Sequence, residues 1–215
     1  MAKVKICGLR TLADVELVNR YQPEYAGFVF ASTRRFVTDE QALLMRKKLA
    51  DSIQAVGVFV DEPMKHVVQL CDMGVINVVQ LHGNETEDYI RALKQKTDIC
   101  VIKAVRVQRA EQVMESMSSV ADFMLFDTYK KGMPGGTGER FSLELLQEGL
   151  AKLRERNCTI KPYFLAGGLD CGNVAQVIRQ TDCYAVDVST GVETDGVKDE
   201  MKVKRFLECV RKRRK

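Results

Sequence analysis

Val4-Lys5-Ile6-Cys7-Gly8-Leu9-Arg10 is a short strand-forming run that ends at a glycine turn. An open, doubly wound α/β sheet that binds a dinucleotide would carry a Gly-rich phosphate turn after its first strand, and this turn lacks that fingerprint. Closed parallel barrels place reactive side chains at the carboxyl ends of their strands, which is where Cys7 stands. The stretch therefore favours a closed barrel and marks Cys7 as a candidate catalytic residue.

Eight short runs rich in strand-forming residues recur along the chain, with helical patterns between them. Thr11, Thr38 and Ser142 each precede such a pattern as an N-terminal cap would, which predicts helix starts there. Regular alternation implies parallel strands joined by right-handed crossovers, and eight such units close a barrel. The predicted fold class is α/β, a (β/α)₈ TIM barrel, with strands at Val4–Cys7, Tyr25–Phe30, Ala55–Val60, Val75–Leu81, Cys100–Val105, Phe123–Asp127, Tyr163–Ala166 and Tyr184–Val188.

The composition fits one globular domain over residues 1–215. With 215 residues, 46% of them hydrophobic, the chain can bury a substantial core, and α/β barrels form single domains at about this length. No apolar run approaches the roughly 18 residues of a membrane span, and no secretory signal follows Met1. We expect a soluble, cytoplasmic protein that does not bind membranes.

The charged residues and the cysteines point to no macromolecular partner. The net charge is +4, but the terminal run Arg211–Lys215 contributes +5, so the rest of the chain carries −1. We expect this basic tail at 211–215 to be a solvated, dispensable helix end and not a nucleic-acid site, because no aromatic residue is interleaved with it. The seven cysteines form no close pairs of a zinc or redox motif, which fits reduced thiols in the cytosol.

Alternation along the first strand puts Lys5 and Cys7 on one face and Val4 and Ile6 on the other. The Lys5 ammonium would then stand beside the thiol and favour the thiolate, which makes Cys7 a usable base near neutral pH. Most free cysteines are small core residues, however. The position of Cys7, taken by itself, therefore leaves a purely structural role open.

Polar residues that end the predicted strands mark the catalytic end of a barrel. Asp127 ends the sixth strand just before the glycine cluster 132–138, which we expect to form a mobile loop over the active face. This position makes Asp127 the strongest candidate for an acid partner to Cys7, with a helix or loop cap as the structural alternative. The full set of strand-end residues is Cys7, Asp61, His82, Arg106, Asp127 and Ser189.

Two loops together predict a phosphate site. The loop after the seventh strand contains Gly167 and Gly168, and the loop after the eighth contains Ser189, Thr190 and Gly191. Glycine lets backbone N–H groups approach an anion closely, and loops seven and eight are where such barrels most often hold phosphate. Ordinary turn chemistry would explain either loop, but their joint occurrence favours phosphate binding.

Further side chains are expected at the same mouth. Arg34 and Arg35 follow the second strand, and a guanidinium there could bind a carboxylate through two parallel hydrogen bonds. His82 ends the fourth strand and could orient a substrate. The structural alternatives are arginines that are merely solvated and a strand-end histidine whose ring nitrogens are hydrogen-bonded to neighbouring residues.

Eight sequence motifs follow one another in order: Val4–Gly8, Gly27–Phe30, Val56–Val60, Val79–Gly83, Ile102–Val105, Gly135–Gly138, Gly167–Leu169 and Asp187–Glu193. Together they cover Lys3 to about Phe206, and over this length the chain resembles the phosphoribosylanthranilate isomerase family of tryptophan biosynthesis. So many motifs in order make the resemblance specific.

The resemblance implies an Amadori rearrangement of N-(5-phosphoribosyl)anthranilate to 1-(2-carboxyphenylamino)-1-deoxyribulose 5-phosphate, with no metal or organic cofactor. Asp127 would then be the general acid and Cys7 the base that removes the C2 proton. Arg35 would bind the anthranilate carboxylate, and the loops at Gly168 and at Ser189 to Gly191 would bind the phosphate. The full set of substrate-binding residues expected is Arg35, His82, Gly136, Gly167, Gly168, Ser189, Thr190 and Gly191.

The chain departs from the family pattern at three places. Thr33-Arg34 replaces a common Ser-Pro before the arginine, which leaves Arg34 and Arg35 both open as the carboxylate ligand. The other two departures, at residues 141–143 and 170–172, touch helix starts and bear on local geometry. The alternatives are a histidine-pathway isomerase, whose substrate has phosphates at both ends, and an inactive barrel that serves as a binding module. The sequence does not determine the oligomeric state.

Overall fold

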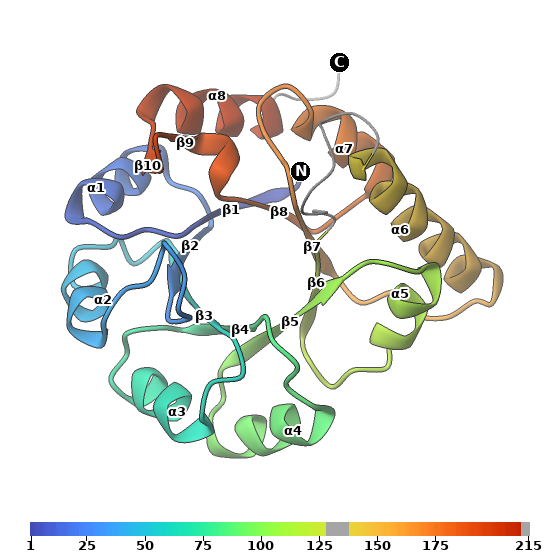
Figure 1. Ribbon diagram of the computed structural model, residues 1–215, viewed down its shortest axis with the longest axis horizontal. Helices are drawn as coiled ribbons and strands as arrows, with labels where there is room; N and C mark the ends of the chain where they lie inside the picture. The colour runs from blue at the N-terminus through green and yellow to red at the C-terminus, as the bar shows by residue number, and fades with distance from the viewer. Residues whose placement is uncertain (128–137, 212–215) are drawn as a thin grey trace.

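The computed structural model describes residues 1–127 and 138–211. Eight parallel strands pair in chain order and close into a barrel, which the helices surround in a ring (Figure 1). The strands are β1 (Lys3–Cys7), β2 (Tyr25–Val29), β3 (Gln54–Phe59), β4 (Val78–Leu81), β5 (Cys100–Arg106), β6 (Phe123–Asp127), β7 (Tyr163–Ala166) and β8 (Ala185–Val188). The predicted (β/α)₈ barrel is confirmed.

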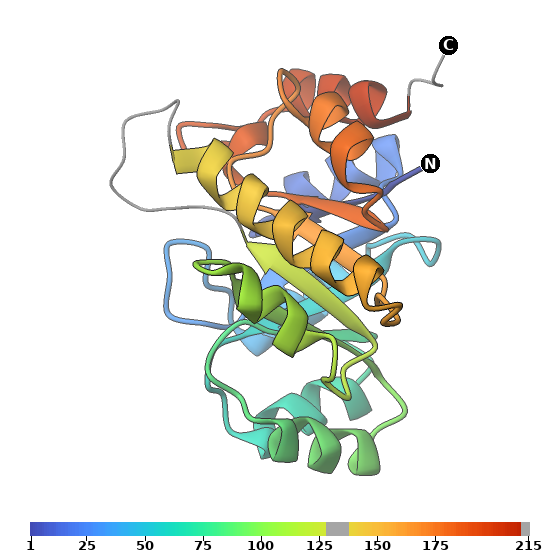
Figure 2. The same cartoon turned by 90° about the vertical axis from the view of Figure 1, so that its right-hand side faces the viewer.

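The helices lie on the outside of the barrel, where α6 runs along the wall beside α5 and α7 (Figure 2). After β8 the chain adds a 3₁₀ turn, η1 (Thr190–Val192), and an antiparallel hairpin of β9 (Glu193–Thr194) and β10 (Val197–Lys198). The helices are α1 (Leu12–Tyr21), α2 (Asp39–Arg46), α3 (Met64–Asp72), α4 (Glu87–Lys96), α5 (Ala110–Ser116), α6 (Gly138–Glu155), α7 (Val174–Thr181) and α8 (Glu200–Arg211).

Several predicted strand ends differ from the structure by one residue, and two boundaries differ by more. Strand β4 begins at Val78 and not at Val75, because the Val75 N–H donates to the Leu70 carbonyl and still belongs to the end of α3. Helix α6 begins at Gly138, before the predicted start at Ser142. The predicted starts of α1 and α2 are correct, since Thr11 and Thr38 each form a reciprocal capping box there.

The core has two layers because strand side chains alternate between the faces of the sheet. Val4, Ile6 and Phe28 point outward and join the cluster between the sheet and the helices. Cys7, Val56 and Phe164 belong to a second cluster that fills the barrel interior. A barrel of this size is closed by its own side chains, so substrates reach its reactive groups at the mouth.

His66 of α3 forms a charged contact with the neighbouring helix. Its Nδ1 lies 2.8 Å from Glu62 Oε1 and its Nε2 lies 2.9 Å from Asp39 Oδ1 at the start of α2. Burial lowers the pKa of His66, but the two carboxylates outweigh this effect and raise it above the ordinary value. When it is protonated, His66 therefore links α2 to α3 through an ion pair.

The basic tail begins inside α8. Arg211 donates hydrogen bonds to the carbonyls of Tyr21 and Gln22 at the end of α1, so the first residue of the predicted solvated run packs on the barrel. The other tail residues, 212–215, lie outside the described residues, and the dispensability of the tail stays a prediction. None of the described helices combines the length and apolar character needed to cross a membrane.

Candidate active site

The thiol of Cys7 lies inside the barrel at the carboxyl end of β1. Cys7 pairs in register with Gly27 of β2. A Cβ at position 27 would lie 3.0 Å from Cys7 Sγ and 3.2 Å from Lys5 Nζ, so the absent side chain makes room for both groups. The predicted alternation is confirmed, since Lys5 and Cys7 lie together within the barrel while Val4 and Ile6 pack against the helices.

Lys5 is fully buried and forms an ion pair with Asp187 of β8. Its Nζ lies 3.0 and 3.1 Å from the two Asp187 carboxylate oxygens. Burial lowers the pKa of Lys5, but Asp187 and Cys7 outweigh it and raise the pKa above its ordinary value. The thiol therefore stands beside a charged ammonium that is shared with a carboxylate, a pairing that the sequence analysis did not anticipate.

Asp127 and His82 face each other across another part of the mouth. Asp127 ends β6, which is separated from β1 by β7 and β8 around the barrel. His82 Nε2 lies 3.5 Å from Asp127 Oδ2, and each side chain is about one-fifth exposed, at 20% and 21%. His82 Nδ1 lies 3.0 Å from the amide nitrogen of buried Gln80, which as donor would leave the ring proton on Nε2, toward Asp127.

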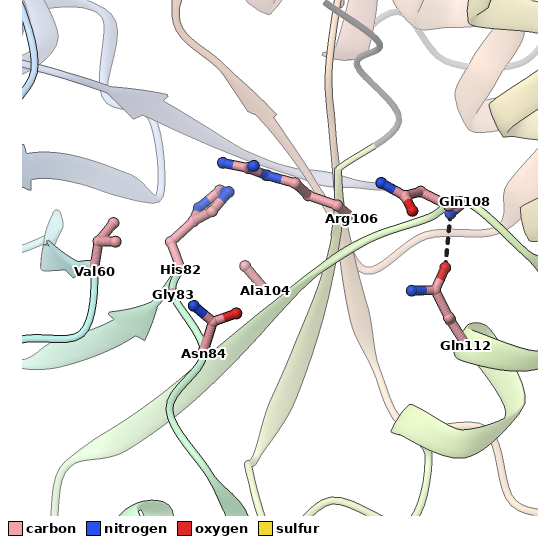
Figure 3. Close-up of a pocket in the computed structure, with 8 residues that line it drawn as sticks. All are labelled: Val60, His82, Gly83, Asn84, Ala104, Arg106, Gln108 and Gln112. Atoms are coloured by element: carbon pink, nitrogen blue, oxygen red, sulfur yellow. Dashed lines mark hydrogen bonds between the residues drawn. The ribbon is translucent and has the colours of Figure 1, made fainter.

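A cavity of about 340 Å³ opens beside this pair. Arg106 pairs in register with Asp127, and its guanidinium reaches across the cavity toward the His82 ring (Figure 3). At the far end, Gln112 Oε1 accepts from the Gln108 N–H and fixes the start of α5. The lining is polar on most sides and comprises Val60, His82, Gly83, Asn84, Ala104, Arg106, Gln108 and Gln112.

The loops after β7 and β8 pack directly against each other. Gly167 and Gly168 have φ values of 98° and 60°, which other residues rarely adopt. A Cβ on Gly191 would collide with the Leu169 carbonyl, so glycine is required for this contact. The Ser189 hydroxyl donates to the Cys7 carbonyl at 2.9 Å, which turns this side chain toward β1 and leaves backbone N–H groups as the means of binding an anion.

Arg34 and Arg35 converge on Glu193. Arg35 donates to both Glu193 oxygens at 2.9 and 3.0 Å and to Thr190 Oγ1 at 2.9 Å, while Arg34 donates to Glu193 Oε2 at 2.8 Å. The Arg35 side chain is 20% exposed and that of Arg34 is 56% exposed. The Arg35 stem crosses Gly8, where a Cβ would collide with it. Arg35 is thus the more firmly placed guanidinium.

Glu193 and Lys198 are site residues that the sequence analysis missed. Burial opposes the charge of Glu193, but hydrogen bonds from Arg35 and Lys198 outweigh this effect and lower its pKa to about 2. Glu193 is the last residue of the motif Asp187–Glu193, and its acidic side chain was the sequence signal that could have identified it as a site residue. Lys198 lies in a two-residue strand that no periodicity marks.

The remaining predicted site residues lie as follows. Gly136 falls outside the described residues, as does the expected glycine loop from 132 to 137. Asp61 has a structural role, because its Oδ1 accepts from the Asn84 N–H and its φ is 52°. Within residues 1–127 and 138–211, no three His, Cys, Asp or Glu side chains are grouped as metal ligands would be.

Comparisons with known proteins show which family this chain is similar to. A family model described as N-(5'phosphoribosyl)anthranilate (PRA) isomerase matches residues 4–209. The chain is 46% identical over 208 residues to the N-(5'-phosphoribosyl)anthranilate isomerase of Lachnoclostridium phytofermentans, with 95% of each chain covered.

Solved structures are similar as well. Phosphoribosyl anthranilate isomerase from Thermotoga maritima superposes with a TM-score of 0.82 at 31% identity, over 97% of this chain and 98% of that chain. A phosphoribosyl anthranilate isomerase in complex with reduced 1-(o-carboxyphenylamino)-1-deoxyribulose 5-phosphate superposes with a TM-score of 0.79 at 30% identity, over 97% of each chain.

Proposed function

Because the chain belongs to the N-(5'-phosphoribosyl)anthranilate isomerase family, we propose that Cys7 and Asp127 are the general base and the general acid of its reaction. The chain is an isomerase of tryptophan biosynthesis that performs the Amadori rearrangement of N-(5-phosphoribosyl)anthranilate. These roles are supported above all by the position of the Cys7 thiol, which lies at the mouth between Lys5 and Gly27.

Two proton transfers, one to the ring oxygen and one from C2, begin the rearrangement. Asp127 protonates the furanose ring oxygen, the bond from C1 to that oxygen breaks, and the anthranilate nitrogen donates its lone pair to form an iminium. The iminium acidifies C2, so Cys7 removes the C2 proton, the electrons of that C–H bond form a C1–C2 double bond, and the C=N electrons return to nitrogen to give the enolamine. The enolamine becomes the ketone when its C2 hydroxyl loses a proton and C1 gains one. Since these steps move only protons, we expect no metal or organic cofactor.

Anionic groups at the two ends of the substrate have separate binding groups at the mouth. Backbone N–H groups at Gly167, Gly168 and the turn from Ser189 to Gly191 would bind the phosphate, as positive φ and close loop packing support. Arg35 would bind the anthranilate carboxylate. His82, which faces Asp127, would orient the sugar hydroxyl groups, and Gly136 remains a proposed contact by resemblance.

We infer a small-molecule phosphosugar substrate and a cytoplasmic location. All seven cysteines are free thiols, which supports a reducing compartment. The cavity at the mouth has the volume of a small-molecule site and polar side chains that can orient a ligand, and its lining residues include no Phe, Tyr or Trp on which a nucleobase could stack.

The reaction is tested with the purified protein and two substrates. Phosphoribosylanthranilate is fluorescent, and its emission should decay when the protein is added. The histidine-pathway aminoaldose, which carries phosphates at both ends, should not be turned over at a comparable kcat/KM. Stable phosphoribosylanthranilate emission in the presence of folded protein, or a preference for the second substrate, would contradict the proposal.

A further inference from the structure

Glu193 is a buried carboxylate that binds three basic side chains at the mouth of the barrel. Its side chain is 3% exposed and contacts Arg34 at 2.8 Å, Arg35 at 2.9 Å and Lys198 at 2.9 Å. With one carboxylate facing three basic groups, positive charge remains in excess at this edge of the mouth. An excess of this kind attracts an anionic ligand.

Lys198 connects the same carboxylate to the strand that carries the proposed base. Its side chain is 2% exposed, and its Nζ donates to the Cys7 carbonyl at 2.6 Å and to Glu193 Oε1 at 2.9 Å. The Ser189 carbonyl lies 3.3 Å from the same Nζ. Burial outweighs the opposing effect of Glu193 and lowers the pKa of Lys198. The 2.9 Å contact between Lys198 Nζ and Glu193 Oε1 is that of an ion pair.

The hairpin of β9 and β10 that carries both residues is fixed at several points. Lys202 of α8 donates to the Glu193 carbonyl at 2.7 Å, and Arg10 donates to the Gly196 carbonyl at 2.6 Å. The Asp199 N–H donates to the Val192 carbonyl at 2.9 Å. In Figure 1 the hairpin lies between α1 and α8, outside β1. Lys198 and Glu193 therefore hold fixed positions relative to Cys7.

The bonds to Glu193 also determine which edge of Arg35 remains for a substrate. Among the described residues, Arg35 uses Nε and Nη2 for its bonds to Glu193 and Thr190. Glu193 and Thr190 together take the Nε–H group and both N–H groups of Nη2, so the two N–H groups of Nη1 remain for another carboxylate. Glu193 thus holds the guanidinium from one side and leaves Nη1 turned away from itself.

We propose that Glu193 and Lys198 are positioning residues of the isomerase reaction: Glu193 orients Arg35 for the substrate carboxylate, and Lys198 fixes the end of β1 so that the Cys7 thiol faces C2. This inference rests on the proposed function. Glu193 then acts on substrate binding and Lys198 on proton removal, although the two side chains form one ion pair.

Kinetics of Glu193→Gln and Lys198→Met separate these two roles. Glu193→Gln removes the charge that holds Arg35, so KM should rise about tenfold, the order of one charge-assisted hydrogen bond, with kcat within about threefold. Lys198→Met should lower kcat about tenfold or more with KM within about threefold. Lys198→Arg keeps a cation and donors for the same carbonyl, so it should recover part of the kcat. The matched controls are Glu155→Gln and Lys65→Met, both exposed on outer helices.

A second readout follows Cys7 without turnover. Alkylation of Cys7 by iodoacetamide, resolved by peptide mass spectrometry, should change in rate in Lys198→Met and stay near wild type in Glu155→Gln. If both site variants lose kcat equally at unchanged KM, or if Cys7 alkylation is the same in all proteins, the inference is overturned. If wild type does not turn over phosphoribosylanthranilate, the proposed function fails, and an unchanged alkylation rate would separately overturn the role of Lys198.

Discussion

Lys5→Met removes the ammonium beside Cys7 and leaves an apolar chain of similar length inside the barrel. Lys5 is fully buried, its Nζ lies 3.0 Å from Asp187 Oδ1, and Asp187 is 8% exposed. The variant therefore leaves a buried carboxylate without its cation. Breaking a buried ion pair in this way costs about 3 to 5 kcal/mol of folding free energy. We expect a loss of stability in this range.

The double variant Lys5→Met/Asp187→Val separates stability from chemistry. Apolar residues of similar volume can replace a buried ion pair at little or no net cost, so the double variant should regain most of the free energy of unfolding. Its kcat should stay about 10²-fold below wild type, at the lower end of what a general base contributes, because the thiol has lost the neighbouring ammonium.

Two measurements on each protein separate the loss of stability from the loss of catalysis. Urea unfolding is followed by far-UV circular dichroism, since the chain contains no Trp, and kcat is measured from phosphoribosylanthranilate fluorescence. Lys65→Met, an exposed lysine on α3, is the matched control. A double variant that recovers both stability and wild-type kcat would refute the catalytic role of Lys5. Unchanged stability in the single variant would refute the buried ion pair.

Three further predictions follow from the site and from α3. Asp127→Asn should lower kcat about 10²- to 10⁴-fold while a reduced product analogue still binds. If this variant turned over at the wild-type rate, another group would have to be the acid. Arg35→Ala should weaken calorimetric binding of that analogue by about 1.5 to 3 kcal/mol and Arg34→Ala by about 1 kcal/mol or less, whereas equal losses would indicate a diffuse basic patch. Because the folded pKa of His66 is raised, its stabilisation should be complete below pH ~6.5 and lost as pH rises through the raised value. His66→Gln should flatten this part of the Tm profile, and an unchanged profile would exclude His66 as its source.

The sequence predicts the barrel well because its strands and helices are marked locally. Capping boxes at Thr11 and Thr38 need only residues three positions apart, and buried strands appear as apolar runs. The start of β4 was misplaced because Val75 is as apolar as a strand residue but completes the end of α3. Whether a backbone N–H bonds to a helix or to a sheet depends on neighbours that a local pattern does not contain.

The candidate site was predictable where it follows strand ends and less so where it depends on contacts between distant segments. Cys7 and Asp127 end their strands, so alternation and position suffice to place them. The Lys198 contact with the Cys7 carbonyl joins residues 191 positions apart. Arg34 and Arg35 are adjacent in sequence, and what distinguishes them is the burial and the two-oxygen contact of Arg35 with Glu193. Such contacts arise only when the barrel closes.

Release of a C2 label into water tests the central claim that Cys7 removes the C2 proton. Phosphoribosylanthranilate deuterated at C2 is incubated with wild type, Cys7→Ala and the matched control Cys158→Ala, whose cysteine is exposed in the loop that follows α6. We predict rapid label release by wild type and by Cys158→Ala, and release by Cys7→Ala slower by about 10²- to 10⁴-fold, the contribution of a general base. Release by folded Cys7→Ala at the wild-type rate would contradict the account.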